Sequence, residues 1–146
     1  MFPHHRMQDT LMNTDLPGLK LLSKGKVRDI YETSSTDHLL FVATDRISAY
    51  DVILRNVRLV LSVFRLDLFI RIQGIPGKGK LLTQISKFWF ERLASIVPNH
   101  FVTDNIDEMP EEVRQYKDRL DGCAMLVKKA TVVPMEAIVR GYLTGA

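Results

Sequence analysis

The chain has 146 residues, with 20 Lys and Arg against 17 Asp and Glu, and 46% of its residues are hydrophobic. This length suits one globular domain and would be cramped for a two-domain enzyme. The single cysteine, Cys123, excludes an internal disulfide and a zinc site built from several cysteines, and it indicates a reducing, cytoplasmic location.

Residues 57–73 form the longest apolar-rich run of the chain. Three arginines and one aspartate interrupt this run, so we expect no membrane span. The same four residues supply +2 of the formal net charge of +3, and the rest of the chain is nearly neutral. A basic nucleic-acid-binding domain is therefore a weak alternative, and we expect no nucleic-acid partner.

The first half of the sequence predicts strands. Residues 1–18 are assigned as a tail, and residues 1–6, which no apolar stretch follows, are expected to be frayed. Residues 19–23 and 27–32 predict a β-hairpin that turns near Gly25, and the short apolar run at 38–44 predicts a central strand.

The second half predicts one main helix and further strands. Apolar residues at spacings of three and four predict one face of a helix over about residues 80–97: Leu82, Ile85, Trp89, Leu93 and Ile96. A short strand at 100–103, a helical turn from Pro110, and a last strand pair at 124–130 and 132–139 follow, with Pro134 as an interruption. The predicted class is α+β, with a mostly antiparallel sheet and one main helix.

Two glycine-containing segments are candidate phosphate sites. Residues 74–81 match the first seven positions of a P-loop, but Leu81 stands where a Ser or Thr should hold magnesium, so a turn that leads into a helix explains them better. Gly25 lies at a predicted turn among Lys24, Lys26 and Arg28, which suits the close approach of a phosphate. A solvated hairpin turn is the alternative for this second segment.

Acidic residues next to apolar strands mark two further candidates. Residues 44–51 contain Asp45, Arg46, Ser48 and Asp51, a density that suits a metal or an anion, whereas capping and turn chemistry is the alternative. Glu136 stands between apolar residues, where an acid needs a partner or a ligand.

Taken in order, four segments resemble the SAICAR synthetase family, the phosphoribosylaminoimidazole-succinocarboxamide synthases of purine biosynthesis. They are residues 25–32, 40–54, 74–91 and 125–145, and the last segment contains a family signature from residue 132. The resemblance covers most of this chain but about the N-terminal half of a typical member. It implies an ATP-binding lobe at 19–130 and the truncated start of a second, substrate-binding domain at 131–146.

This resemblance implies an ATP-dependent ligase. Its members join L-aspartate to the carboxylate of CAIR, a carboxylated aminoimidazole ribonucleotide, and release SAICAR, ADP and phosphate with Mg²⁺ present. By similarity, the ATP phosphates lie at Gly25, Lys26, Val27 and Arg28, and the adenine lies at Lys129, Ala130 and Val132. Glu136 and Arg140 are the implied catalytic residues, and the substrate side is formed by Asp45, Arg46, Ser48, Asp51 and Arg140. No residue of this chain is implied as a metal ligand.

Two departures from the family pattern affect the expected activity. Typical members pass from the equivalent of Leu54 to that of Gly74 through a residue or two, so residues 57–73 look like an insertion. Because Val codons begin with GT and Gln can be encoded by CAG, we hypothesise a retained, translated intron.

Ala146 replaces the serine of the signature, and the family's later Asp-x-Lys-x-Glu segment lies beyond it. We therefore expect this chain alone to make no SAICAR, and a catalytically inactive nucleotide-binding module is the alternative function.

Overall fold

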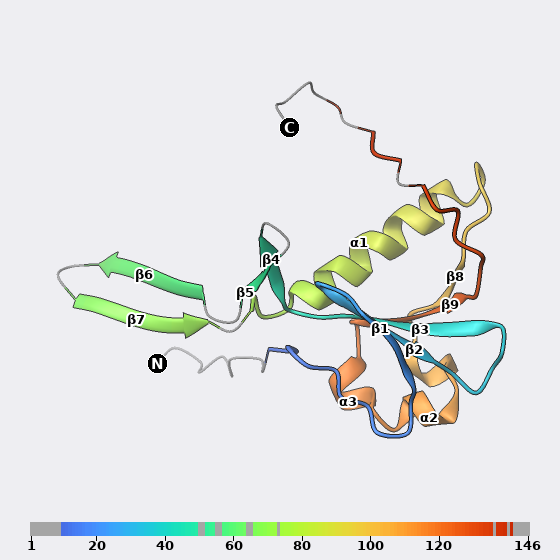
Figure 1. Cartoon of the computed structure of the whole chain (residues 1–146), viewed down its shortest axis with the longest axis horizontal. Helices are drawn as coiled ribbons and strands as arrows, with labels where there is room; N and C mark the ends of the chain where they lie inside the picture. Colours follow the sequence, from blue (N-terminus) through green and yellow to red (C-terminus); the bar gives the residue numbers. More distant parts are fainter. Residues whose placement is uncertain are drawn as a thin grey trace, which may run out of the picture.

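A five-stranded antiparallel sheet forms the centre of the protein (Figure 1). The structure, a computed structural model, describes residues 10–49, 52–54, 57–63, 66–72, 74–135, 137–139 and 141. In spatial order the strands are β1 (Leu21–Lys24), β2 (Arg28–Glu32), β3 (His38–Ala43), β9 (Ala124–Lys128) and β8 (Phe101–Thr103). The predicted class is confirmed, and the predicted central strand is β3, with two strands on each side.

The predicted hairpin near Gly25 is also confirmed, since β1 and β2 pair in antiparallel fashion around that residue. The Gly25 N–H donates to the Arg28 carbonyl at 2.7 Å and closes the turn. A Cβ atom on Gly25 would lie 2.7 Å from the same carbonyl oxygen. The turn is therefore too tight for any residue with a side chain.

One face of the sheet carries the hydrophobic core. Tyr31, Leu40 and Val42 alternate onto this face and are at most 3% exposed. They pack against η1 (Ile106–Glu108), α2 (Glu111–Arg114), α3 (Lys117–Leu120) and the segment before β1. Leu16 of that segment belongs to the core, and residues 1–6, for which fraying was predicted, lie outside the described residues.

The main helix, α1 (Lys78–Leu93), lies on the opposite face of the sheet (Figure 1). It begins after Gly77, whose φ of 77° closes the turn at residues 74–77, so these residues lead into a helix as predicted. The helix approaches β3 so closely that a Cβ on Gly79 would lie 2.5 Å from the Ala43 carbonyl oxygen.

The predicted apolar face of α1 is mostly exposed. The buried helix residues are Gly79 and Thr83, whereas four of the five residues predicted on the apolar face are exposed: Ile85 by 47%, Trp89 by 51%, Leu93 by 39% and Ile96, which follows the end of the helix, by 77%. The close contact with the sheet selects small residues for the inner side of the helix. The larger apolar residues consequently lie on surface that no described residue covers.

Two further hairpins connect β3 to α1. The first pairs β4 (Ile47–Ala49) with β5 (Val52–Leu54), and the second pairs β6 (Val57–Val63) with β7 (Leu66–Ile72). The predicted insertion at 57–73 thus forms mainly the β6–β7 hairpin, which extends away from the five-stranded sheet (Figure 1). Its strands are rich in β-branched and other aliphatic residues, which favour extended pairing.

The predicted last strand at 132–139 is wrong. Residues 131–135 and 137–139 contain no strand, and Val132 is 84% exposed and Val139 is 98% exposed. Both edges of β9 are already paired, with β3 and with β8, and Pro134 has no N–H to donate. The preceding prediction, the strand at 124–130, corresponds to β9.

Candidate functional site

The turn between β1 and β2 borders a cavity lined by cations. We call residues 25–28 the Gly25 loop. With Lys24 and Leu82, the loop lines a cavity of about 570 Å³, and the charged residues of its lining are Lys24, Lys26 and Arg28. The structure therefore brings the four predicted phosphate-side residues together at one cavity of uniform positive charge.

The carbonyl groups of the Gly25 loop are held from the protein interior. The carbonyls of Gly25 and Lys26 accept hydrogen bonds from the Arg46 guanidinium, at 3.0 and 3.2 Å respectively. The Val27 carbonyl accepts from the Thr44 N–H at 2.8 Å and from its hydroxyl at 2.9 Å. Since Arg46 and Thr44 are buried, these negative ends of the peptide dipoles are directed inward.

Arg28 links the loop to α1. Its Nη2 donates to the Ser86 hydroxyl at 3.0 Å, and that hydroxyl donates to the Leu82 carbonyl at 2.9 Å. The half-buried guanidinium is therefore placed between the cavity and the helix.

Asp45 connects three segments. Its carboxylate accepts from the Leu11 N–H at 2.9 Å and from the Gly79 N–H at 2.8 Å, so it caps the N-terminus of α1. Lys78 adds a bond from its Nζ to the Arg46 carbonyl at 2.7 Å, and burial lowers the pKa of Lys78. The capping alternative for Asp45 is the one that agrees with this geometry.

Arg46 is buried against Asp29, at 3% and 1% side-chain exposure, and their ion pair measures 2.5 Å. All five guanidinium N–H groups are used within the protein. The expected direct substrate contact of Arg46 is thus corrected, because this side chain has no donor left for a ligand. Ser48 is half-buried in β4, opposite Ile53, and its substrate contact stays a prediction.

The predicted adenine residues lie at the far end of the sheet. Lys129 follows β9, and its N–H donates to the Asp37 carbonyl at 2.7 Å. In the register of the sheet, Ala43 of β3 lies opposite Arg28, whereas His38 lies opposite Lys128. At about 3.3 Å per residue, the six-residue strand β3 separates the two sites by about 17 Å.

Three predicted site residues, Asp51, Glu136 and Arg140, lie outside the described residues. Ala130 and Val132 are described and exposed. Their predicted contacts stay predictions.

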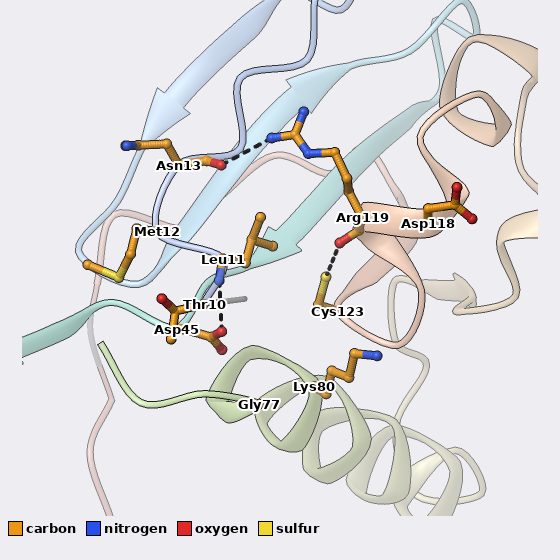
Figure 2. A pocket seen from close by; sticks show the side chains of 10 residues that line it. All are labelled: Thr10, Leu11, Met12, Asn13, Asp45, Gly77, Lys80, Asp118, Arg119 and Cys123. Atoms are coloured by element: carbon orange, nitrogen blue, oxygen red, sulfur yellow. Dashed lines mark hydrogen bonds between the residues drawn. The ribbon is translucent and has the colours of Figure 1, made fainter. Parts of the chain in front are cut away.

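A second cavity of about 680 Å³ lies where the segment before β1 meets α1 and α3 (Figure 2). Its charged lining residues are of both signs: Asp45, Asp118, Lys80 and Arg119. Burial raises the pKa of the Cys123 thiol to about 11, which makes it a poor nucleophile at neutral pH. The mixed charge suits a polyphosphate less well than the lining of the Gly25 loop does.

The described residues contain neither a metal-binding cluster nor a membrane-spanning helix. Within them, no group of three or more His, Cys, Asp or Glu is arranged to bind a metal ion. None of the helices in the described part of the chain has the length and apolar character needed to cross a membrane.

The sequence interpretation missed the residues that hold the Gly25 loop, which are Asp29, Thr44 and Ser86. Asp29 carries a usable signal, because an acid at the inward position of a sheet strand requires a cationic partner. Thr44 and Ser86 carry none, since a hydroxyl residue is common at a strand end and on a helix.

Comparison with known proteins identifies the fold. The sequence model of the SAICAR synthetase family matches residues 21–58 and 67–146. The chain belongs to this family. The match leaves out residues 59–66, which lie within the β6–β7 hairpin.

Individual SAICAR synthases agree with this assignment. The chain is 51% identical over 140 residues to the phosphoribosylaminoimidazole-succinocarboxamide synthase of Thermodesulfovibrio yellowstonii, covering 96% of this chain and 41% of that protein. The Syntrophotalea carbinolica enzyme is 48% identical over 136 residues, which cover 93% of this chain and 40% of that protein. The structure of SAICAR synthase from Saccharomyces cerevisiae complexed with SAICAR matches with a TM-score of 0.73 and 43% identity, over 93% of this chain and 42% of that one. The chain thus spans about two fifths of the length of these relatives.

Proposed function

We propose that this chain is the ATP-binding lobe of a SAICAR synthase, which in purine biosynthesis joins L-aspartate to CAIR and gives SAICAR, ADP and phosphate. The observation that carries the proposal is the Gly25 loop, with its carbonyls held inward and three cations around its cavity. Membership of the family and similarity to a SAICAR synthase that was solved with SAICAR support the choice of reaction. Cytoplasmic location is part of the same proposal.

The loop is suited to hold the phosphate chain. A carboxylate is a poor electrophile, and ATP supplies the phosphoryl group that converts it to an acyl phosphate for attack by the aspartate amine. Lys24, Lys26 and Arg28 neutralise the phosphate charge, and the glycine permits a close backbone approach. Positioning and charge neutralisation are the main contributions a protein makes to such a transfer.

The rest of the nucleotide would extend along the sheet toward Lys129, Ala130 and Val132. The separation of about 17 Å along β3 suits an extended nucleoside triphosphate. Ile30, Leu39 and Phe41 are half-buried on the sheet face between the two ends and offer an apolar surface. Mg²⁺ would accompany ATP, but the described residues offer no cluster of ligands for it, so we assign it no residue and no step.

Glu136 and Arg140 are assigned to CAIR by similarity to the family, and Ser48 and Asp51 are placed on the same substrate side. The chain covers 41% and 40% of the length of two relatives in the family. We therefore expect the chain to bind ATP without producing SAICAR, which is also how the alternative function, an inactive nucleotide-binding module, would behave.

Isothermal titration of the purified chain with ATP tests the proposal. Gly25→Ala should weaken binding at least about tenfold, because the new Cβ would lie 2.7 Å from the Arg28 carbonyl and displace the loop. Gly141→Ala is the matched control, since its Cβ would meet no atom of the described residues within 4 Å. A wild-type chain that binds no ATP would refute the proposal, and SAICAR formed from CAIR, aspartate and ATP by this chain alone would refute the expectation that it makes none.

A further inference from the structure

Arg46 has an unusual position for a residue at the end of a strand. It is 3% exposed, and each of its five N–H groups has an acceptor. Two of these bonds go to the Asp29 carboxylate, and the others go to the carbonyls of Gly25, Lys26 and Met12. The ion pair neutralises its charge locally, so Arg46 contributes little electrostatic attraction to a ligand in the cavity.

What Arg46 does control is the direction of the loop carbonyls. A carbonyl oxygen that faced the cavity would repel a phosphate oxygen. When the carbonyl points into the protein, the groups that face the cavity are N–H groups and cations. Arg46 holds the Gly25 and Lys26 carbonyls, and Thr44 holds the Val27 carbonyl. Three successive carbonyls are thus fixed on the interior side of the loop.

We infer that Arg46 is a positioning residue for phosphate binding: it holds the Gly25 loop in the conformation that accepts a polyphosphate, without touching the ligand. This inference rests on the proposed function, since it concerns the same loop. Thr44 has the same positioning role with a smaller effect, because it donates to the Val27 carbonyl only.

The inference predicts a selective loss of affinity. Arg46→Lys keeps the charge next to Asp29, but three N–H donors on one nitrogen cannot replace the five bonds of the guanidinium to Asp29 and to three carbonyls. The affinity for ATP should fall about tenfold, while the affinity for AMP should change less than about twofold, because the loop faces the phosphate chain. A general loss of structure would lower both affinities together.

The test combines nucleotide titration with amide hydrogen exchange at residues 25–28. In Arg46→Lys the Gly25 amide should exchange at least about tenfold faster, since its bond to the Arg28 carbonyl depends on the closed turn. Arg114→Lys, which changes an exposed arginine on α2, is the matched control and should leave both readouts unchanged.

Thr44→Val keeps the test decisive if Arg46→Lys does not fold. It removes the hydroxyl bond to Val27 with almost no change of volume, and it should shift the ratio of ATP to AMP affinity in the same direction by a smaller factor. Folded variants whose affinity ratio and exchange at residues 25–28 equal those of the wild type would overturn the inference. If the wild type bound no nucleotide, the proposed function would fail, and the exchange measurement would still decide whether Arg46 holds the loop.

Discussion

The buried pair of Asp29 and Arg46 makes a quantitative prediction for stability. Asp29 is 1% exposed, and its carboxylate accepts two bonds from Arg46, at 2.5 and 3.0 Å, and one from the Thr14 hydroxyl at 2.7 Å. Asp29→Asn removes the charge but keeps the shape, so it leaves a buried guanidinium without its counter-ion and creates no cavity. Breaking a buried pair in this way costs about 3–5 kcal/mol.

Urea unfolding followed by far-UV circular dichroism measures this cost. With a urea dependence of about 1–3 kcal/mol per molar, the midpoint should fall by about 2 M. Such a loss is a large part of the roughly 5–15 kcal/mol that stabilises a typical domain. Glu111→Gln is the control, because its ion pair with Arg114 lies at the surface, with Glu111 92% exposed, and its removal should leave the midpoint unchanged. A midpoint for Asp29→Asn within about 0.3 M of the wild type, at an unchanged slope, would refute the reasoning.

Four further predictions follow from single features. Gly74→Ala should lower the free energy of unfolding by about 2–3 kcal/mol, because the residue has a φ of 82° and a Cβ there would lie 2.5 Å from the Asp45 carbonyl oxygen; Gly141→Ala in the same urea titration should cost nothing measurable. Burial, with the nearby Arg28 charge, lowers the pKa of His100 below its usual 6.5. The unfolded state therefore binds more protons, and the free energy of unfolding should fall as the pH drops through 6.5. His100→Gln should flatten this pH dependence, and an equally steep dependence of the variant's stability on pH would contradict the prediction. Cys123 should resist alkylation at pH 8 in the native chain and react at once in urea, since its thiol is 4% exposed and its pKa is about 11; rapid modification under native conditions would show that the site is open. Deletion of residues 57–73 should leave the far-UV spectrum of the five-stranded sheet intact and raise solubility, because β6 and β7 pair only with each other within the described sheets; loss of cooperative unfolding would show that the hairpin supports the fold.

The sequence was sufficient to predict the strands that carry their own periodicity. The hairpin around Gly25 and the apolar central strand were both predicted, because local turn chemistry and strand burial determine them. The position of α1 was predicted within a few residues, but its orientation was not, since periodicity shows only that a face is apolar and not whether that face is covered. The strand expected at 132–139 failed for a tertiary reason, namely that both edges of β9 are occupied.

For the site, residue type predicted the loop but not the residues that hold it. Gly25 and its neighbouring cations were identified because a glycine between lysines at a turn is a local signal. Arg46 was assigned to the substrate because a sequence shows charge but not burial, and only its contact with Asp29, 17 residues away, shows that it faces inward. Long-range pairs of this kind depend on the register of the sheet.

The exposed apolar surface of α1 has a spectroscopic consequence. The chain contains one tryptophan, Trp89, and it lies on this surface, 51% exposed, with its ring 5.3 Å from that of Phe88 in an edge-to-face arrangement. Its fluorescence therefore arises from one site and reports on the polarity around the outer side of α1. Any polypeptide that covers this surface would shift the emission to shorter wavelength, so the chain carries an intrinsic optical probe of its own association.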